Sequence, residues 1–129
     1  MTQDEILEPI VKAVRQGTSL SGPEIRRFFQ DWEAIPVQVN GRHVGTAVMK
    51  GTEIHFALVP SWRPRSCQRG AIRAFLKPLF DRHGFLTTRV AHERPAQKKF
   101  VQRVGFKPTW RDEQVEYFLL GKMPYERNP

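Results

Sequence analysis

Residues 35–59 read IPVQVNGRHVGTAVMKGTEIHFALV, and this stretch decides the fold. Apolar and polar residues alternate through much of it, which is the pattern of a strand with one buried face. Asn40-Gly41 is the strongest short-range signal for a hairpin, and Lys50-Gly51 marks a second turn. We therefore predict an antiparallel meander of three strands, over residues 35–39, 42–49 and 53–59.

A first helix is expected at the N-terminus. Thr2 followed by Glu5 forms a capping-box pattern, and Gly17 provides a stop. Pro9 falls inside this segment, and a proline within a helix removes a backbone hydrogen bond. We therefore expect the regular helix to begin only near Glu8.

A second helix is expected directly before the meander. Ser21 followed by Glu24 is another capping box. Apolar residues then follow at helical spacing, namely Ile25, Phe28, Phe29 and Trp32. This spacing predicts a stripe that faces the core.

The second half of the chain begins with an amphipathic helix, predicted over residues 69–82. Pro78 inside this segment should kink the helix, and Gly84 follows its end. Its apolar residues recur at helical spacing and predict a core stripe of Ile72, Phe75, Leu76, Leu79 and Phe80.

The remaining elements complete the predicted fold. They are a strand over residues 85–90, a helix from Pro95 to about residue 103, and strands over 107–110 and 115–120. The predicted order is α-α-β-β-β-α-β-α-β-β, in which the long helix and its two flanking strands form the one expected parallel crossover. This order predicts an α/β (α+β) fold: a mixed, mostly antiparallel sheet with one parallel crossover pair and helices on both faces.

Length and composition indicate one globular domain. With 129 residues, of which 40% are hydrophobic and 26% charged, the chain is unlike disordered, collagen-like or coiled-coil proteins. The single cysteine, Cys67, has no partner for an internal disulfide, which fits a reducing compartment. No apolar run approaches the roughly 18 residues that span a bilayer, and the N-terminus is acidic, unlike a signal peptide. We therefore expect a cytoplasmic protein without a membrane partner.

The positive charge is concentrated in one part of the chain. The net charge is +8, and residues 61–111 alone carry 13 basic and two acidic side chains, a net charge of +11. Such a field favours a polyanionic partner. A phosphorylated cofactor, a nucleic acid and an acidic protein surface all fit, as does a solvated basic face with no dedicated ligand.

Three segments resemble the GNAT superfamily of N-acetyltransferases. The hairpin over residues 37–45 is similar to the family's second and third strands, and residues 53–60 with the Arg-rich loop and helix that follow are similar to its fourth strand and acetyl-CoA loop. Residues 90–106, which end in Gly105-Phe106, resemble its fifth strand and fourth helix. The resemblance covers about residues 35–120 and implies a compact, divergent GNAT-like member.

The resemblance implies one domain over residues 1–129, with N-terminal helices over 1–33, a sheet and cofactor-loop core over 35–120, and a tail over 121–129. It also implies acetyl-CoA as the cofactor. Backbone groups of Leu58 and Val59 would bind the pantetheine. The phosphates would lie on the loop and helix start, at Arg65, Gln68, Arg69, Gly70 and Ala71.

The sequence departs from the family pattern at three positions. If the loop pattern is read from Arg65, Gln68 stands where the first glycine belongs; if it is read from Cys67, Ile72 stands where the second belongs. A side chain at either glycine position obstructs the approach of a phosphate to the backbone. Arg94 stands where the family has an Asn, at a position we assign to cofactor binding. Phe100 replaces the usual Tyr and has no proton for the leaving thiolate.

The third strand carries the candidate catalytic residues, Glu53 and His55. Residues 53–56 resemble the fourth strand of the histone-acetyltransferase branch, where a Glu acts as general base. An attacking ammonium must lose a proton, which a nearby carboxylate can accept. Glu53 and His55 share a strand face by the two-residue period. A surface glutamate that simply begins a strand is the competing interpretation.

These features favour an acyl-CoA-dependent N-acyltransferase that transfers acetyl directly from acetyl-CoA to an unknown amine. One alternative is a catalytically inactive GNAT-fold binding or structural protein, such as the compact members in tailed phage genomes. A second alternative is a basic nucleic-acid-binding module. The four histidines show no ligand spacing, so we assign no metal.

Overall fold

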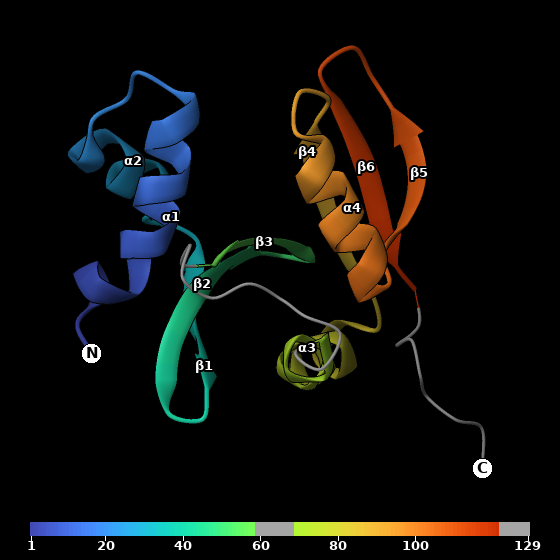
Figure 1. The fold of residues 1–129 in the computed structure, drawn as a ribbon, viewed down its shortest axis with the longest axis horizontal. Helices are drawn as coiled ribbons and strands as arrows, with labels where there is room; N and C mark the ends of the chain where they lie inside the picture. Colours follow the sequence, from blue (N-terminus) through green and yellow to red (C-terminus); the bar gives the residue numbers. More distant parts are fainter. Residues whose placement is uncertain (59–68, 122–129) are drawn as a thin grey trace. The chain divides into compact units, whose positions relative to one another are not determined.

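The computed structural model describes residues 1–58 and 69–121, and Figure 1 traces their course. The elements follow the predicted order. The first unit, Met1–Arg63, contains α1 (Gln3–Gly17), α2 (Gly22–Phe28), β1 (Glu33–Val39), β2 (Arg42–Lys50) and β3 (Glu53–Leu58). The second unit, Pro64–Pro129, contains α3 (Arg69–His83), β4 (Leu86–Ala91), α4 (Pro95–Val104), β5 (Lys107–Arg111) and β6 (Val115–Leu120).

Helix α1 begins earlier than the sequence led us to expect. The Thr2 hydroxyl accepts a hydrogen bond from the Glu5 amide at 3.2 Å, and the Thr2 carbonyl accepts one from Ile6 at 3.0 Å. These bonds close the first turn ahead of Pro9, so the helix starts at Gln3. The expected start near Glu8 is therefore wrong, because the cap compensates for what the proline removes.

Helix α2 has the predicted capping box but not the whole predicted stripe. The Ser21 hydroxyl accepts from the Glu24 amide at 3.3 Å, and Glu24 accepts from the Ser21 amide at 3.3 Å. Ile25 is buried, whereas Phe28 is 65% exposed. The helix ends at Phe28, so helical spacing does not continue to Trp32. Placing Phe28 in the core was wrong.

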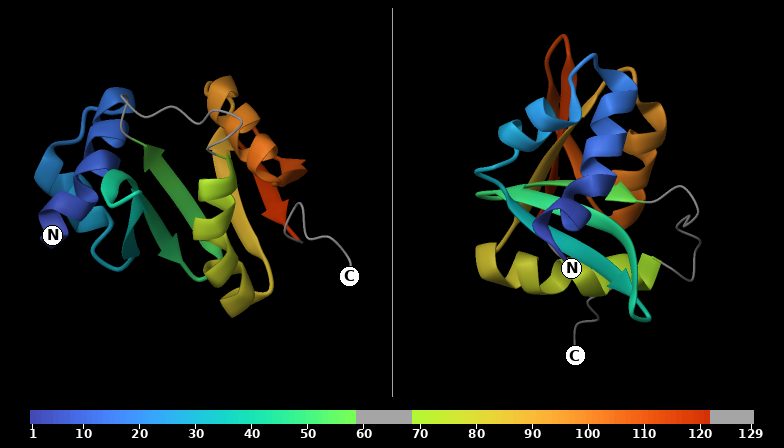
Figure 2. Two further views of the ribbon diagram at one scale, coloured as in Figure 1. Left: turned by 60° about the horizontal axis from the view of Figure 1, so that its bottom comes forward. Right: turned by 90° about the vertical axis from the view of Figure 1, so that its left-hand side faces the viewer.

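The predicted meander is present in the first unit. Strands β1 and β2 pair antiparallel, as do β2 and β3. Asn40 and Gly41 both have positive φ, at 52° and 76°, as a two-residue hairpin turn requires. Helix α1 lies across the three strands (Figure 2). The core between them consists of Leu7, Ile10, Val11, Ile25, Val48 and Ala57.

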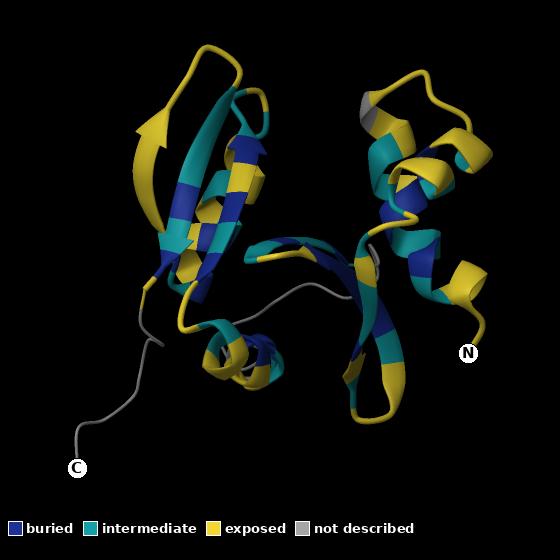
Figure 3. Ribbon diagram, turned by 180° about the vertical axis from the view of Figure 1, so that it is seen from behind, coloured by how far each residue is buried: buried dark blue, intermediate teal, exposed yellow. Residues whose placement is uncertain are grey.

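In the second unit, β6 lies between β4 and β5. Both β4 and β5 pair antiparallel with β6. Buried and more exposed residues alternate along β4, as Figure 3 shows, so one face of the strand faces the core. The buried set from this unit includes Leu86, Val90, Val101, Val104, Phe106, Phe118 and Leu120.

The stripe predicted for α3 is confirmed at its centre. Ile72, Leu76 and Leu79 are buried, and the helix continues through Pro78 to His83. Gly84 follows with a φ of 80°, and its amide donates to the Phe80 carbonyl at 2.7 Å. A residue with a side chain is strained at this φ, which explains the glycine.

The predicted fold class, an α/β arrangement of mostly antiparallel strands with helices, is confirmed. The strand, helix and strand of the predicted crossover are β3, α3 and β4, in that order along the chain. The predicted tail after Gly121 lies outside the described residues. Among the helices of residues 1–58 and 69–121, none is long and apolar enough to cross a membrane.

Candidate active site

Strand β3 places Glu53 and His55 on the face of the meander that carries the core residue Ala57. Glu53 pairs with Lys50 and His55 pairs with Val48 of β2. Because side chains alternate along a strand, Glu53, His55 and Ala57 share one face. Val48 and Ala57 both belong to the cluster packed beneath α1, so this face looks toward the N-terminal helices.

Glu53 and His55 are in direct contact. His55 Nε2 lies 2.5 Å from Glu53 Oε2, and the two side chains are 32% and 25% exposed. The Trp32 ring covers the imidazole, with ring centroids 5.7 Å apart. Partial burial strengthens the interaction between carboxylate and imidazole, while the remaining exposure leaves both within reach of water.

At the other end of β3, Leu58 lies opposite Gly45 of β2. The approach is so close that a Cβ on Gly45 would stand 2.5 Å from the Ala57 carbonyl oxygen and 2.9 Å from Leu58 Cα. Only glycine fits here, because real Cβ atoms do not come this close to backbone. The glycine of the hairpin motif thus fixes the position of the strand end that was predicted to bind pantetheine.

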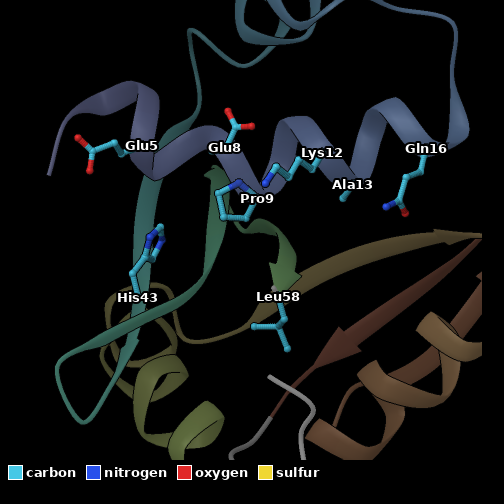
Figure 4. Close-up of a pocket in the computed structure, with 8 residues that line it drawn as sticks. All are labelled: Glu5, Glu8, Pro9, Lys12, Ala13, Gln16, His43 and Leu58. Carbon is cyan, nitrogen blue, oxygen red and sulfur yellow. The ribbon is translucent and has the colours of Figure 1, made fainter. Parts of the chain in front are cut away.

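A pocket of about 410 Å³, which we call the α1 pocket, opens beside this strand end, between α1, the start of β2 and the end of β3. Its lining residues belong to the first unit: Glu5, Glu8, Pro9, Lys12, Ala13, Gln16, His43 and Leu58. Figure 4 shows Glu5 and His43 toward one end, with the Glu5 carboxylate pointing away from His43, and Gln16 toward the other end, while the Lys12 side chain reaches back toward Pro9 above Leu58.

A short hydrogen-bond chain holds His43 in place. The Thr46 hydroxyl, which is fully buried, donates to the Ile6 carbonyl and lies 3.2 Å from His43 Nε2. The Ile6 carbonyl belongs to α1, so this bond ties β2 to the helix above it. His43 was not among the predicted site residues. The sequence around His43 does not show that α1 lies over β2, because only the folded chain brings the two elements together.

Known proteins resemble this chain in structure but not in sequence. The sequence matches no family model and no curated protein. A chimaera of the Vibrio cholerae spermidine N-acetyltransferase SpeG and hSSAT superposes with a TM-score of 0.64 at 12% identity, over 93% of both chains. A GNAT-family acetyltransferase from Bacillus anthracis gives 0.61 at 15% identity, over 88% of this chain and 82% of the other.

The chain has the GNAT fold. The structural resemblance extends beyond residues 35–120, on which the sequence resemblance rests, because the SpeG chimaera covers 93% of the chain. At these identities the likeness concerns the fold, so the activity must be argued from the chain's own residues.

The cofactor residues expected from the GNAT resemblance are described only in part. Leu58 ends β3 and lines the pocket. Arg69 and Gly70 are the first two residues of α3, and Ala71, which follows them, is half-buried. Val59, Arg65 and Gln68 lie outside the described residues.

Arg94 takes the N-cap position of α4 in this GNAT fold. Its side chain makes no capping hydrogen bond, and its amide donates to the Ala91 carbonyl at 3.0 Å. As a whole residue, Arg94 is half-buried. A cation at a helix start is electrostatically unfavourable unless an anion is near, which is compatible with the predicted role in binding phosphate.

The structure brings some of the predicted residues together and leaves others apart. Glu53 and His55 form one pair, while Leu58 lies five residues along the strand from Glu53, about 16 Å away at the rise of a β-strand. The described lining of the pocket includes Leu58 but neither member of the pair. The candidate site thus has two parts, one at each end of β3.

A further polar cluster lies in the second unit and has a structural role. His92 Nε2 lies 2.7 Å from the Asp112 carbonyl oxygen, and Lys98 Nζ lies 2.8 Å from His92 Nδ1 and 3.2 Å from Glu116 Oε1. These contacts tie α4 and the end of β4 to the β5–β6 hairpin. Within residues 1–58 and 69–121, no group of three His, Cys, Asp or Glu side chains is arranged to hold a metal ion.

Proposed function

We propose that this protein is an N-acyltransferase that transfers an acetyl group from acetyl-CoA directly to an amine. The observation that carries the proposal is the 2.5 Å contact between His55 Nε2 and Glu53 Oε2 on β3. In the GNAT resemblance, Glu53 stands at the position of the general base. A half-buried carboxylate that contacts an imidazole is suited to accept a proton from an ammonium, directly or through water.

Glu53 and His55 have different roles in the proposed reaction. Glu53 accepts the proton that the attacking amine must lose before its lone pair can bond to the acyl carbon. His55 orients the carboxylate and shares the proton once it has arrived. A C–N bond forms and the C–S bond breaks, with its electron pair going to sulfur. Phe100 has no proton to give, so water protonates the sulfur.

The residues present fit acetyl-CoA by their chemistry. Arg69 begins α3, and a helix start with arginines beside it suits a pyrophosphate. Backbone groups at Leu58 and Val59 would bind the pantetheine amides, and Arg65, Gln68, Gly70, Ala71 and Arg94 would contribute to the phosphate side. Bound acetyl-CoA would supply an acyl group activated as a thioester.

The first experiment is calorimetric titration with acetyl-CoA at moderate salt, with ATP as the charge control. We expect saturable binding at micromolar concentration that ATP does not reproduce. No binding, or equal binding of ATP, would contradict the cofactor assignment and favour a GNAT-fold protein that has lost transfer.

The second experiment tests the base. Glu53→Gln keeps the size of the side chain and removes the carboxylate, so acetyl-CoA should still bind while kcat falls about 10²–10⁴-fold. Glu113→Gln, in the exposed β5–β6 turn, serves as the matched control and should leave turnover unchanged. If Glu53→Gln turns over as fast as the wild type, Glu53 is not the base.

A further inference from the structure

A cluster of aromatic rings adjoins the Glu53–His55 pair. The Trp32 ring lies 5.7 Å from the imidazole of His55, measured between ring centroids. Trp32 also meets Phe29 edge-on at 5.6 Å, and it lies nearly parallel to Phe28, at 6.4 Å and 28°. The rings therefore form one continuous apolar surface, which begins at the imidazole and leads to the C-terminal end of α2.

The register of the sheet explains why Trp32 and Glu53 lie close together. Ala34 of β1 pairs with Val48 of β2, and Val48 pairs with His55 of β3, so these three residues form one row on the face toward the N-terminal helices. Trp32 stands two residues before Ala34, and Glu53 stands two residues before His55. Because β1 and β3 both run antiparallel to β2, they share one direction, so Trp32 and Glu53 lie at the same end of this face.

The outer part of the aromatic surface is exposed. Phe28 is 65% exposed, the highest fraction among the large hydrophobic side chains of residues 1–58 and 69–121, and Leu20 is 42% exposed. Beside them lies a pocket of about 260 Å³ whose described lining is entirely apolar: Val14, Leu20, Ile25, Phe28 and Phe29. Exposed apolar side chains that adjoin one another, rather than single ones, are typical of a binding surface.

The charges around the cluster favour a ligand with a single ammonium. The Glu53 carboxylate lies at the inner end, and two exposed acidic residues, Asp31 and Glu33, flank Trp32 in the sequence. Carboxylates attract an ammonium, and the faces of aromatic rings do so as well. Lys50 is exposed and pairs with Glu53 across the β2–β3 turn, so it limits the positive charge that this end can accept. The described lining of the apolar pocket offers no partner for a second charge.

We propose that the acceptor is an amine with one ammonium and an aromatic body. The ammonium lies at Glu53, where the proposed base accepts its proton, and the aromatic body packs on Trp32 and Phe28. Aromatic rings gain from offset-stacked and edge-to-face contacts in addition to burial, which favours an aromatic body here. This inference rests on the proposed N-acyltransferase function, because it gives the ligand the role of acceptor.

The preference for an aromatic body can be measured without any transfer. The probes are 2-phenylethylamine and ethylamine, which carry the same ammonium and differ by the ring. Each is titrated into the ¹⁵N-labelled protein, and the indole N–H signal of Trp32, assigned with Trp32→Phe, is followed. We expect 2-phenylethylamine to shift this signal saturably and to bind at least tenfold more tightly than ethylamine, a difference of about 1.4 kcal/mol.

Two truncations locate the preference. Phe28→Ala should remove most of the difference between the probes and leave the affinity for ethylamine unchanged. Phe85→Ala, at a phenylalanine that is 44% exposed in the second unit, is the matched control and should keep the difference. Equal binding of the two amines by the wild type, or an unchanged preference in Phe28→Ala, would overturn the proposal.

Transfer assays with acetyl-CoA separate this inference from the proposed function. If 2-phenylethylamine binds with the expected preference but is never acetylated, the binding surface stands and the proposed function fails. If both amines are acetylated with equal kcat/KM, the proposed function stands and the preference for an aromatic body fails.

Discussion

Gly45 and Leu58 lie opposite each other in the β2–β3 pair, with no space between them for even one added carbon. A Cβ on Gly45 would stand 2.9 Å from Leu58 Cα and 2.5 Å from the Ala57 carbonyl oxygen. Both obstacles include backbone, which cannot rotate away. This contact links the hairpin to the strand end that lines the α1 pocket.

Gly45→Ala should destabilise the fold by about 1–3 kcal/mol, since β2 and β3 must separate to admit the methyl group. Urea unfolding with a fixed m-value measures the change. Gly121→Ala is the control, because the nearest atom to a Cβ there, on Leu119, is 4.0 Å away. Equal midpoints for the two variants would show that the strands are not packed as described.

Thr46→Val should cost about 1–3 kcal/mol, because it leaves the Ile6 carbonyl and the His43 ring without their buried partner. Valine has nearly the shape of threonine, so packing is preserved. Thr46→Ser keeps the hydroxyl and should lose only the contribution of one buried methyl, about 0.8 kcal/mol. Thermal unfolding of the three proteins gives the order, and a valine variant more stable than the serine variant would contradict it.

Ile25 and Phe28 are three residues apart on α2 and should respond very differently to truncation. Ile25→Ala removes a fully buried side chain from the core of the first unit and should cost about 2–5 kcal/mol. Phe28→Ala removes a ring that is 65% exposed and should cost much less. Comparable losses of unfolding free energy would mean that Phe28 is packed after all.

The stability of the protein in acid should depend on Asp112. The backbone amides of Val115 and Gln114 donate to its carboxylate at 2.8 and 2.7 Å and hold its pKa below the ordinary value of 3.8. Because the folded pKa is the lower one, the carboxylate stabilises the fold above pH 3.8, and this contribution is lost as the pH falls through the folded pKa.

Asp112→Asn should therefore flatten the acid limb of the stability curve, measured by urea unfolding between about pH 5 and pH 2. The neighbouring Glu113→Gln variant should retain the slope of the wild type. An unchanged slope in Asp112→Asn would mean that the turn does not hold the carboxylate in solution.

Local signals in the sequence predict the elements well, and they do so for physical reasons. Asn40-Gly41 fixes a turn because both residues tolerate positive φ, and the capping boxes at Thr2 and Ser21 satisfy helix ends with neighbours three residues away. Such signals need no tertiary contact. The errors arise where tertiary context decides, as at Phe28, whose helix ends before the stripe is complete.

The same distinction between local and tertiary information applies to the candidate site. The contact between Glu53 and His55 follows from the two-residue period of one strand, so the sequence is sufficient to predict it. The position of the His43 ring depends on α1 lying over β2, on the Ile6 carbonyl of that helix, and on the buried Thr46 between them. These groups lie about 40 residues apart in sequence, and no spacing rule connects them.

Trp32 gives the candidate pair Glu53 and His55 an optical reporter. Its indole lies 5.7 Å from the His55 ring, and an imidazolium at that range quenches indole emission far more strongly than a neutral imidazole. Each change in the proton content of the Glu53–His55 pair therefore alters the brightness of a neighbouring chromophore. In a variant whose other two tryptophans, Trp62 and Trp110, are replaced by phenylalanine, the protonation state of the pair can be followed in real time by fluorescence, without a label.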